Sequence, residues 1–288
     1  RHTRSVSAFL LNRSSDLPLV ARWGLAPVIA IDLITFAVAV TTVAVTRFPE
    51  PVRERASAPV DHRWRPALAW LNGPGRPLRT LLCVGALVNA ALALFNLGIL
   101  TLATHLGGPE RAGLPVGAVG VAIVLGSLVV GARGVAADRV ATFAVGLAAT
   151  AVGCTIVAVG AHLAFVVVGG VVAVALIPAM NAALATVFQE RVPAEMQGRV
   201  FGLRGAIGGA LYPIAAAVGG VLIDEVGAPL MDGPLAGSVG ALIGTGADRG
   251  AALVVLACGA ALGAIAVWLA RSGIRPALRA PGADAAGA

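Results

Sequence analysis

The stretch that decides the fold of this chain runs from residue 163 to residue 187 and reads LAFVVVGGVVAVALIPAMNAALATV. It contains no charged residue. A helix needs about 20 mostly apolar residues, at about 1.5 Å each, to cross a hydrocarbon core of about 30 Å. Residues 163–187 are therefore long enough and apolar enough to span a bilayer.

Six further stretches have the same character. They cover residues 26–46, 80–103, 113–133, 140–160, 203–223 and 251–270. Strands of a membrane β-barrel would instead appear as segments of about 10 residues with alternating apolar and polar positions. The apolar runs here are continuous, so the sequence predicts an all-α multi-pass membrane protein with about seven transmembrane helices.

The composition excludes several other classes of protein. Only 12% of the residues are charged and 58% are hydrophobic, whereas a soluble domain carries about 25% charged residues. The net charge of +7 comes from arginines in the loops beside the apolar stretches, where basic residues set membrane topology. We therefore expect a lipid bilayer and no nucleic acid as partner. The three cysteines form no CxxC motif or Cys/His cluster, so we expect no metal, disulfide or cofactor.

The arginines alternate between the two sides of the expected bundle. On one side, the three loops 47–79, 133–139 and 188–204 and the tail after residue 270 contain seven, two, three and three arginines, whereas the opposite loops contain two in all. The positive-inside rule makes the arginine-rich side cytoplasmic and places the C-terminus there, in the plasma or inner membrane. Seven spans would then put the four arginines of residues 1–22 outside. We therefore expect that the upstream helices of a longer protein are missing.

This pattern divides the chain into five parts. Residues 1–25 form an irregular N-terminal segment, 26–46 a first transmembrane helix, and 47–79 a basic cytoplasmic linker with a short helix over 65–72. Residues 80–270 form a block of six helices, and 271–288 a disordered cytoplasmic tail. The outer loop 224–250 contains an apolar segment, 235–243, that favours a short interfacial or re-entrant helix.

Three segments together carry a family resemblance. Residues 189–204 read QERVPAEMQGRVFGLR and are followed by a glycine-rich apolar span that ends in GGVLID at residues 219–224. Residues 31–36 read IDLITF, and residues 237–246 read GSVGALIGTG. Over residues 20–279 this chain resembles exporters of the major facilitator superfamily, in the branch of drug and macrolide efflux proteins and enterobactin exporters.

The resemblance implies a fold of twelve helices in two halves. This chain would supply helix six, the central cytoplasmic loop and helices seven to twelve, and the other half would be a missing partner. The implied function is proton-coupled efflux of a small molecule, a drug or a siderophore, by alternating access. The alternative is a non-transporting membrane module, or a truncated half that needs a partner chain.

The family signature after the eighth helix is Gly-x-Leu-Ala-Asp-Arg-x-Gly-Arg-Arg. Residues 134–142 read GVAADRVAT, which keeps Gly134, Asp138 and Arg139 but loses the final glycine and basic pair. Physically, Asp138 could reach a helix N-terminus or an arginine and close an inside gate, or the segment could be an ordinary turn. The other candidate gate residues follow the fifth span: Gln197, Gly198, Arg199 and Arg204. We expect Arg204 to extend its charge toward the cytoplasm.

Few polar groups occur at membrane depth. Asn89 and Asn96 are seven residues apart and share one helix face, and Asn181 lies just after Pro178. With Tyr212, these residues are candidates for a substrate path, although the amides could equally bridge helices. Asp32 is the possible intramembrane carboxylate, although an anchoring role at the interface is the alternative. Because no span contains a catalytic pair such as Ser/His or two aspartates, we do not expect an enzyme.

The first testable prediction concerns topology. Single cysteines placed in residues 224–250 should react with a membrane-impermeant thiol reagent added outside the cell, and cysteines in residues 47–79 should not. The reverse pattern would contradict the orientation derived from the arginines.

Overall fold

The computed structural model describes residues 25–46, 64–246, 249–274 and 278, and the chain divides into two units, Arg1–Arg63 and Trp64–Ala288. The expectations for residues 1–24, for the linker before residue 64 and for almost all of the tail beyond residue 274 lie outside the described residues. In the first unit, helix α3 covers Leu25–Val45. Its described apolar side chains are exposed, as in Phe36 at 69%, which suits a lipid-facing helix.

The second unit contains the block of long helices. Its elements are α4 (Arg65–Asn72), α5 (Arg76–Gly107), α6 (Gly113–Arg133), α7 (Arg139–Val159), α8 (Leu163–Val174), α9 (Ile177–Arg191), α10 (Ala194–Val221), the π-helical turn η1 (Leu222–Gly227), α11 (Ala228–Asp232), α12 (Val239–Ile243) and α13 (Gly250–Arg271). Six helical segments of the described residues are long and apolar enough to cross a membrane, and no strand occurs among these residues. The predicted all-α multi-pass membrane fold is confirmed.

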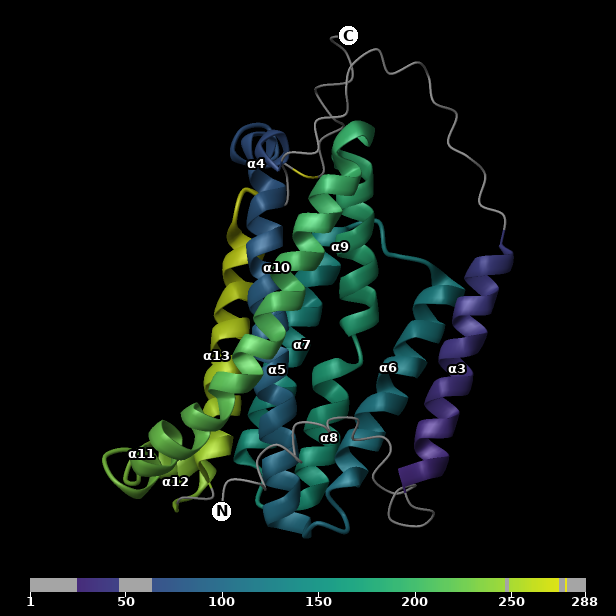
Figure 1. Ribbon diagram of the computed structural model, residues 1–288. Coiled ribbons are helices and arrows are strands. Elements are labelled where there is room, and N and C mark those ends of the chain that lie inside the picture. Colours follow the sequence, from purple (N-terminus) through teal and green to yellow (C-terminus); the bar gives the residue numbers. More distant parts are fainter. Residues whose placement is uncertain (1–24, 47–63, 247–248, 275–277, 279–288) are drawn as a thin grey trace. The chain divides into compact units, whose positions relative to one another are not determined.

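Successive crossing segments of the second unit alternate in direction (Figure 1). Helices α5, α7 and α10 therefore begin at the end where α6, α9 and α13 finish. We call this end the arginine-rich end, and its described arginines include Arg79, Arg133, Arg139, Arg191, Arg199 and Arg271. Helices α11 and α12 lie at the opposite end. The alternation of arginines along the sequence thus corresponds to two opposite ends of one bundle.

The apolar stretch 163–187 forms two helices instead of one. Helix α8 ends at Val174 and α9 begins at Ile177, directly before Pro178. Proline has no backbone N–H, and its ring collides with the carbonyl four residues earlier, so the helix is interrupted there. The carbonyl of Ala173, in the last turn of α8, accepts a 2.8 Å hydrogen bond from the buried hydroxyl of Thr150 on α7. A polar backbone group that the break would leave without a partner is thus satisfied inside the bundle.

Helix α7 packs against α8, α9 and α13, and glycines allow its close contacts. A Cβ atom at Gly153 of α7 would lie 2.4 Å from the backbone nitrogen of Ala173 and 2.5 Å from the carbonyl of Gly169, both on α8. On the other side of α7, a Cβ at Gly259 of α13 would lie 2.7 Å from Cβ of Cys154. Lipid tails are as apolar as side chains, so helix association in a membrane depends on such close packing.

The short helix predicted within the linker is confirmed by α4, which also packs into the second unit, where Ala67 and Leu71 are buried. One local prediction differs from the structure. In the loop after α10, only Val239–Ile243 of the expected segment 235–243 is helical, because turns occupy the preceding residues. Glycines at 233 and 237 favour turns over a continuous helix there.

The close contact of α7 with α8 gives a stability prediction. Gly153→Ala should lower the free energy of unfolding by about 1–3 kcal/mol, because the added methyl group meets backbone atoms that cannot move aside. Gly117→Ala is the matched control, since a Cβ at Gly117 meets nothing within 4 Å. It should be neutral or stabilising by up to about 1 kcal/mol through helix propensity. Thermal unfolding in detergent measures both, and equal stability of the two variants would contradict the packing argument.

Candidate functional site

A cavity of about 510 Å³ lies among α5, α7, α9 and α10. Its polar lining residues are Asn89 on α5, Asn181 on α9, and Arg204 and Tyr212 on α10. Three of the four residues predicted for a substrate path therefore meet at one place, although they are up to 123 positions apart in the sequence. The volume is typical of small-molecule sites, which measure about 300–1,000 Å³.

Asn89 and Tyr212 lie far from both ends of their helices, and Asn181 lies beside the break between α8 and α9. Asn89 is thirteen residues after the start of α5, which corresponds to about 20 Å at 1.5 Å per residue. Tyr212 is eighteen residues after the start of α10, or about 27 Å. Asn181 is four residues after the start of α9, next to the break between α8 and α9. In a bilayer these side chains would be at membrane depth, where a polar group needs protein or water as its partner.

Glycines on α10 leave the space that the cavity occupies. Gly205, Gly208 and Gly209 line it, and a Cβ at Gly205 or Gly209 would meet nothing within 4 Å. At Gly208 a Cβ would lie 3.1 Å from the amide nitrogen of Asn89. The glycines of α10 thus leave empty space beside the helix, whereas the glycines between α7 and α8 bring two backbones into contact.

Asn96, the fourth predicted residue, does not line the cavity but contacts one that does. Its amide nitrogen lies 3.2 Å from the hydroxyl oxygen of Tyr212 and donates to the carbonyl of Leu92 at 3.0 Å. Asn89 donates to the carbonyl of Gly85 at 3.0 Å. The hydrogen bond between Asn96 and Tyr212 joins α5 to α10 and fixes the phenol at the end of the cavity away from the arginine-rich end.

Arg204 lines the cavity on the side toward the arginine-rich end, ten residues after the start of α10. Its guanidinium carbon lies 5.6 Å from the ring centroid of Phe188, which is buried near the end of α9. Phe188 packs edge-to-face against Phe201, another lining residue, with ring centroids 6.2 Å apart. A cation over an aromatic face is attracted to it, so this pair holds the half-buried guanidinium at the cavity wall. Sequence reasoning missed the two phenylalanines, whose spacing in the chain gives no sign that they meet.

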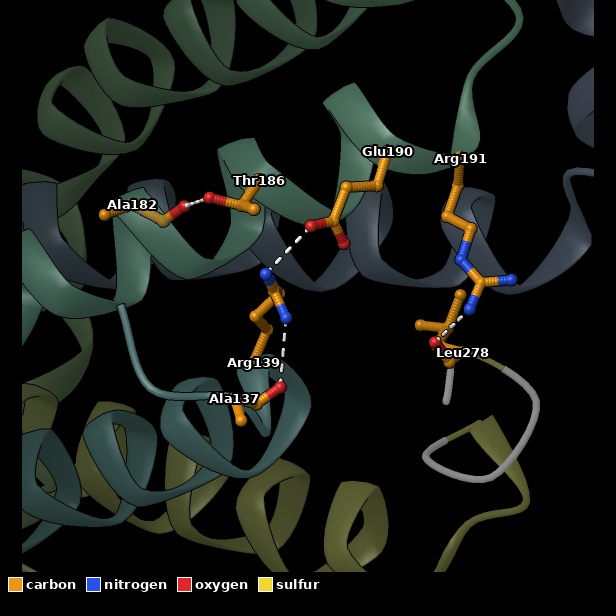
Figure 2. Close-up of polar contacts among 7 residues, drawn as sticks. All are labelled: Ala137, Arg139, Ala182, Thr186, Glu190, Arg191 and Leu278. Atoms are coloured by element: carbon orange, nitrogen blue, oxygen red, sulfur yellow. Dashed lines mark hydrogen bonds and ion pairs between the residues drawn. The ribbon is translucent and has the colours of Figure 1, made fainter. Parts of the chain in front are cut away.

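The signature loop between α6 and α7 forms a set of contacts at the arginine-rich end (Figure 2). Gly134 has a φ of 72°, a left-handed conformation that favours glycine. The Asp138 side chain accepts a 3.0 Å hydrogen bond from the backbone N–H of Ala141 and so caps α7.

Arg139 links this loop to α9. It donates to Glu190 at 2.8 Å and to the carbonyl of Ala137 at 3.0 Å. The side chains of Arg139 and Glu190 remain 29% and 49% exposed, so this ion pair contributes at most about 1 kcal/mol. Glu190 thus pairs inside the second unit. Arg191, which follows Glu190 in the chain, donates to the carbonyl of Leu278.

The other candidate gate residues lie around the connection from α9 to α10. The Gln197 side chain donates to the carbonyls of Gln189 at 3.1 Å and Val192 at 3.2 Å, which fastens the start of α10 to the end of α9. Gly198 is exposed and Arg199 is half-buried at the same end, and neither lines the cavity.

Asp32 belongs to α3 of the first unit, and its side chain lies outside what the structure describes. Over the described ranges, no group of three or more His, Cys, Asp or Glu residues could hold a metal ion.

The cap on α7 can be tested directly. Asp138→Ala should lower stability by about 0.5–2 kcal/mol, because the first turn of α7 loses an acceptor for a backbone N–H. Asp138→Asn should stay within a few tenths of a kcal/mol of the natural protein, since asparagine caps helices as well as aspartate does. Thermal unfolding of the three proteins in detergent measures this. A loss for Asp138→Asn equal to that for Asp138→Ala would show that the charge, and not the cap, determines the stability.

No protein-family model matches this chain, and neither curated proteins nor solved structures give a significant match.

Proposed function

We propose that this chain acts in the transmembrane transport of a small molecule, with the cavity among α5, α7, α9 and α10 as its share of the substrate site. The observation that carries the proposal is a cavity of about 510 Å³ whose polar groups lie on helical segments long and apolar enough to cross a membrane. Polar and charged groups at membrane depth are costly and in general serve a function. Lipid tails cannot solvate them, so the cavity holds water, a ligand or another part of a protein.

The interrupted helix supports a transport role. Irregular backbone at membrane depth is tolerated where it is buried or lines a cavity, and transporters place substrate sites beside broken helices. The break between α8 and α9 is followed by Ile177, Met180 and Asn181, all of which line the cavity. The described lining residues contain no pair of groups suited to catalysis, such as serine with histidine or two carboxylates.

The resemblance to major facilitator exporters extends the proposal to mechanism. A second body of helices would cover the open face of α10 and complete the cavity, and rocking of the two bodies would alternate its access. Proton-coupled efflux from the cytoplasm, through the plasma or inner membrane, is the corresponding mode. The ion pair of Arg139 with Glu190 at the arginine-rich end would then hold α7 and α9 together as one rigid body while the gate opens.

Thiol labelling tests whether access to the cavity alternates between the two sides of the membrane. In a variant without Cys83, Cys154 and Cys258, cysteines at Asn89 and Asn181 should react with a hydrophilic, membrane-impermeant reagent. Labelling from one side should prevail without a gradient, and an imposed pH gradient should shift it toward the other side. Val124, exposed on α6 and outside the cavity, is the control position. Its cysteine should stay unreactive because lipid surrounds it.

Two outcomes would contradict parts of the proposal. If the cysteines at Asn89 and Asn181 react from neither side, the cavity is not open to water and transport through it fails. If they react from one side only under every gradient, a membrane module without alternating access fits better.

A further inference from the structure

We infer that the cavity binds an organic anion, with the anionic group on Arg204 and the rest of the molecule extending toward Tyr212. This inference rests on the proposed function, because it names the class of molecule that the same cavity accepts. Arg204 is the only charged residue among the described residues that line the cavity. A ligand that enters the cavity therefore meets one fixed positive charge.

Arg204 differs from its neighbours in how its charge is compensated. Arg139 forms an ion pair with Glu190, and Arg191 donates to the carbonyl of Leu278. Among the described residues Arg204 has no carboxylate partner, and its guanidinium lies over the ring of Phe188. The ring positions the guanidinium without neutralising it. No hydrogen bond to another described residue uses the Arg204 guanidinium, and its planar set of N–H donors suits a carboxylate, sulfonate or phosphate.

The remaining lining gives the anion a direction. Counted along their helices, Arg204 and Asn181 each lie ten residues from the arginine-rich end, Asn89 lies thirteen and Tyr212 eighteen. Apolar residues such as Phe143, Met180 and Leu184 complete the walls. An amphipathic molecule with an anionic head and an aromatic or aliphatic body would satisfy the cation at one end and the apolar walls along its length. A cationic molecule would instead bring a second positive charge beside Arg204.

Three fluorescent probes of nearly equal shape test this inference. Dansylglycine carries a carboxylate, dansylglycinamide is its neutral counterpart, and dansylethylenediamine carries an ammonium group. Each is titrated into the full chain in nanodiscs of neutral phosphatidylcholine, and empty nanodiscs supply the background. Dansylglycine should bind at least about tenfold more tightly than dansylglycinamide, since a charge-assisted hydrogen bond contributes on this scale. Dansylethylenediamine should bind most weakly.

Two arginine variants locate the preference. Arg204→Gln should reduce the ratio between the anionic and neutral probes to within about threefold, whereas Arg204→Lys should keep part of it because the charge remains. Arg133→Gln is the matched control. It removes a charge at the same end of the bundle from an exposed residue at the end of α6 that does not line the cavity, and it should leave the ratio unchanged.

A substitution on α10 shows whether the probes occupy the cavity. Gly209→Leu adds a side chain where the backbone faces open space, so the fold should tolerate it while the cavity becomes smaller. It should weaken the binding of all three probes.

Different results of this experiment would overturn the anion inference and the proposed function. If Gly209→Leu weakens binding but the natural protein shows no preference for the anion, or Arg204→Gln leaves the preference intact, the cavity remains a ligand site and the anion inference is overturned. If no probe binds, or Gly209→Leu weakens none of them, the cavity is not a ligand site, and both the inference and the proposed function fall. The probe ratio of the natural protein decides the anion inference even if Arg204→Gln does not fold.

Discussion

The constraint on which the rest of this structure depends is that lipid offers no hydrogen bonds to a backbone. A membrane-crossing segment outside a closed barrel must therefore be helical, and the carbonyl freed at the break between α8 and α9 needs a partner from a neighbouring helix. Thr150 provides that help by donating to the carbonyl of Ala173. Because the break is satisfied from α7, the chain can place Asn181 beside a cavity without leaving this carbonyl unpaired.

Glycine has two opposite uses in the same unit. Gly153 and Gly169 bring α7 and α8 into backbone contact, and Gly259 does the same for α13 against α7. On α10, Gly205 and Gly209 meet nothing within 4 Å and leave the cavity open. The absence of a side chain allows contact where a second helix approaches, and leaves room where none does. The bundle is thus closed around α7 and open along α10.

Charged side chains also have two different uses in this unit. At the arginine-rich end, Arg139 and Glu190 neutralise each other, and Asp138 is used as a helix cap. In the cavity, the guanidinium of Arg204 is held by an aromatic ring and has no acidic partner among the described residues. The charges at the arginine-rich end thus hold helices together, whereas the charge of Arg204 is available to a ligand. This difference is the reason for inferring that the cavity binds an anion.

The sequence by itself determined the membrane class, the helical fold and the two ends of the bundle, because length, hydropathy and arginine position act locally along each segment. It also singled out Asn89, Asn181 and Tyr212, since polar residues are rare in such spans. Only the tertiary structure decided that these three share a cavity with Arg204, because the lining comes from helices distant in the sequence. The same holds for the stacking of Arg204 on Phe188, for the pairing of Glu190 with Arg139, and for which glycines close a contact. These facts depend on how helices lie against one another, and the hydropathy of each helix carries no information about its neighbours.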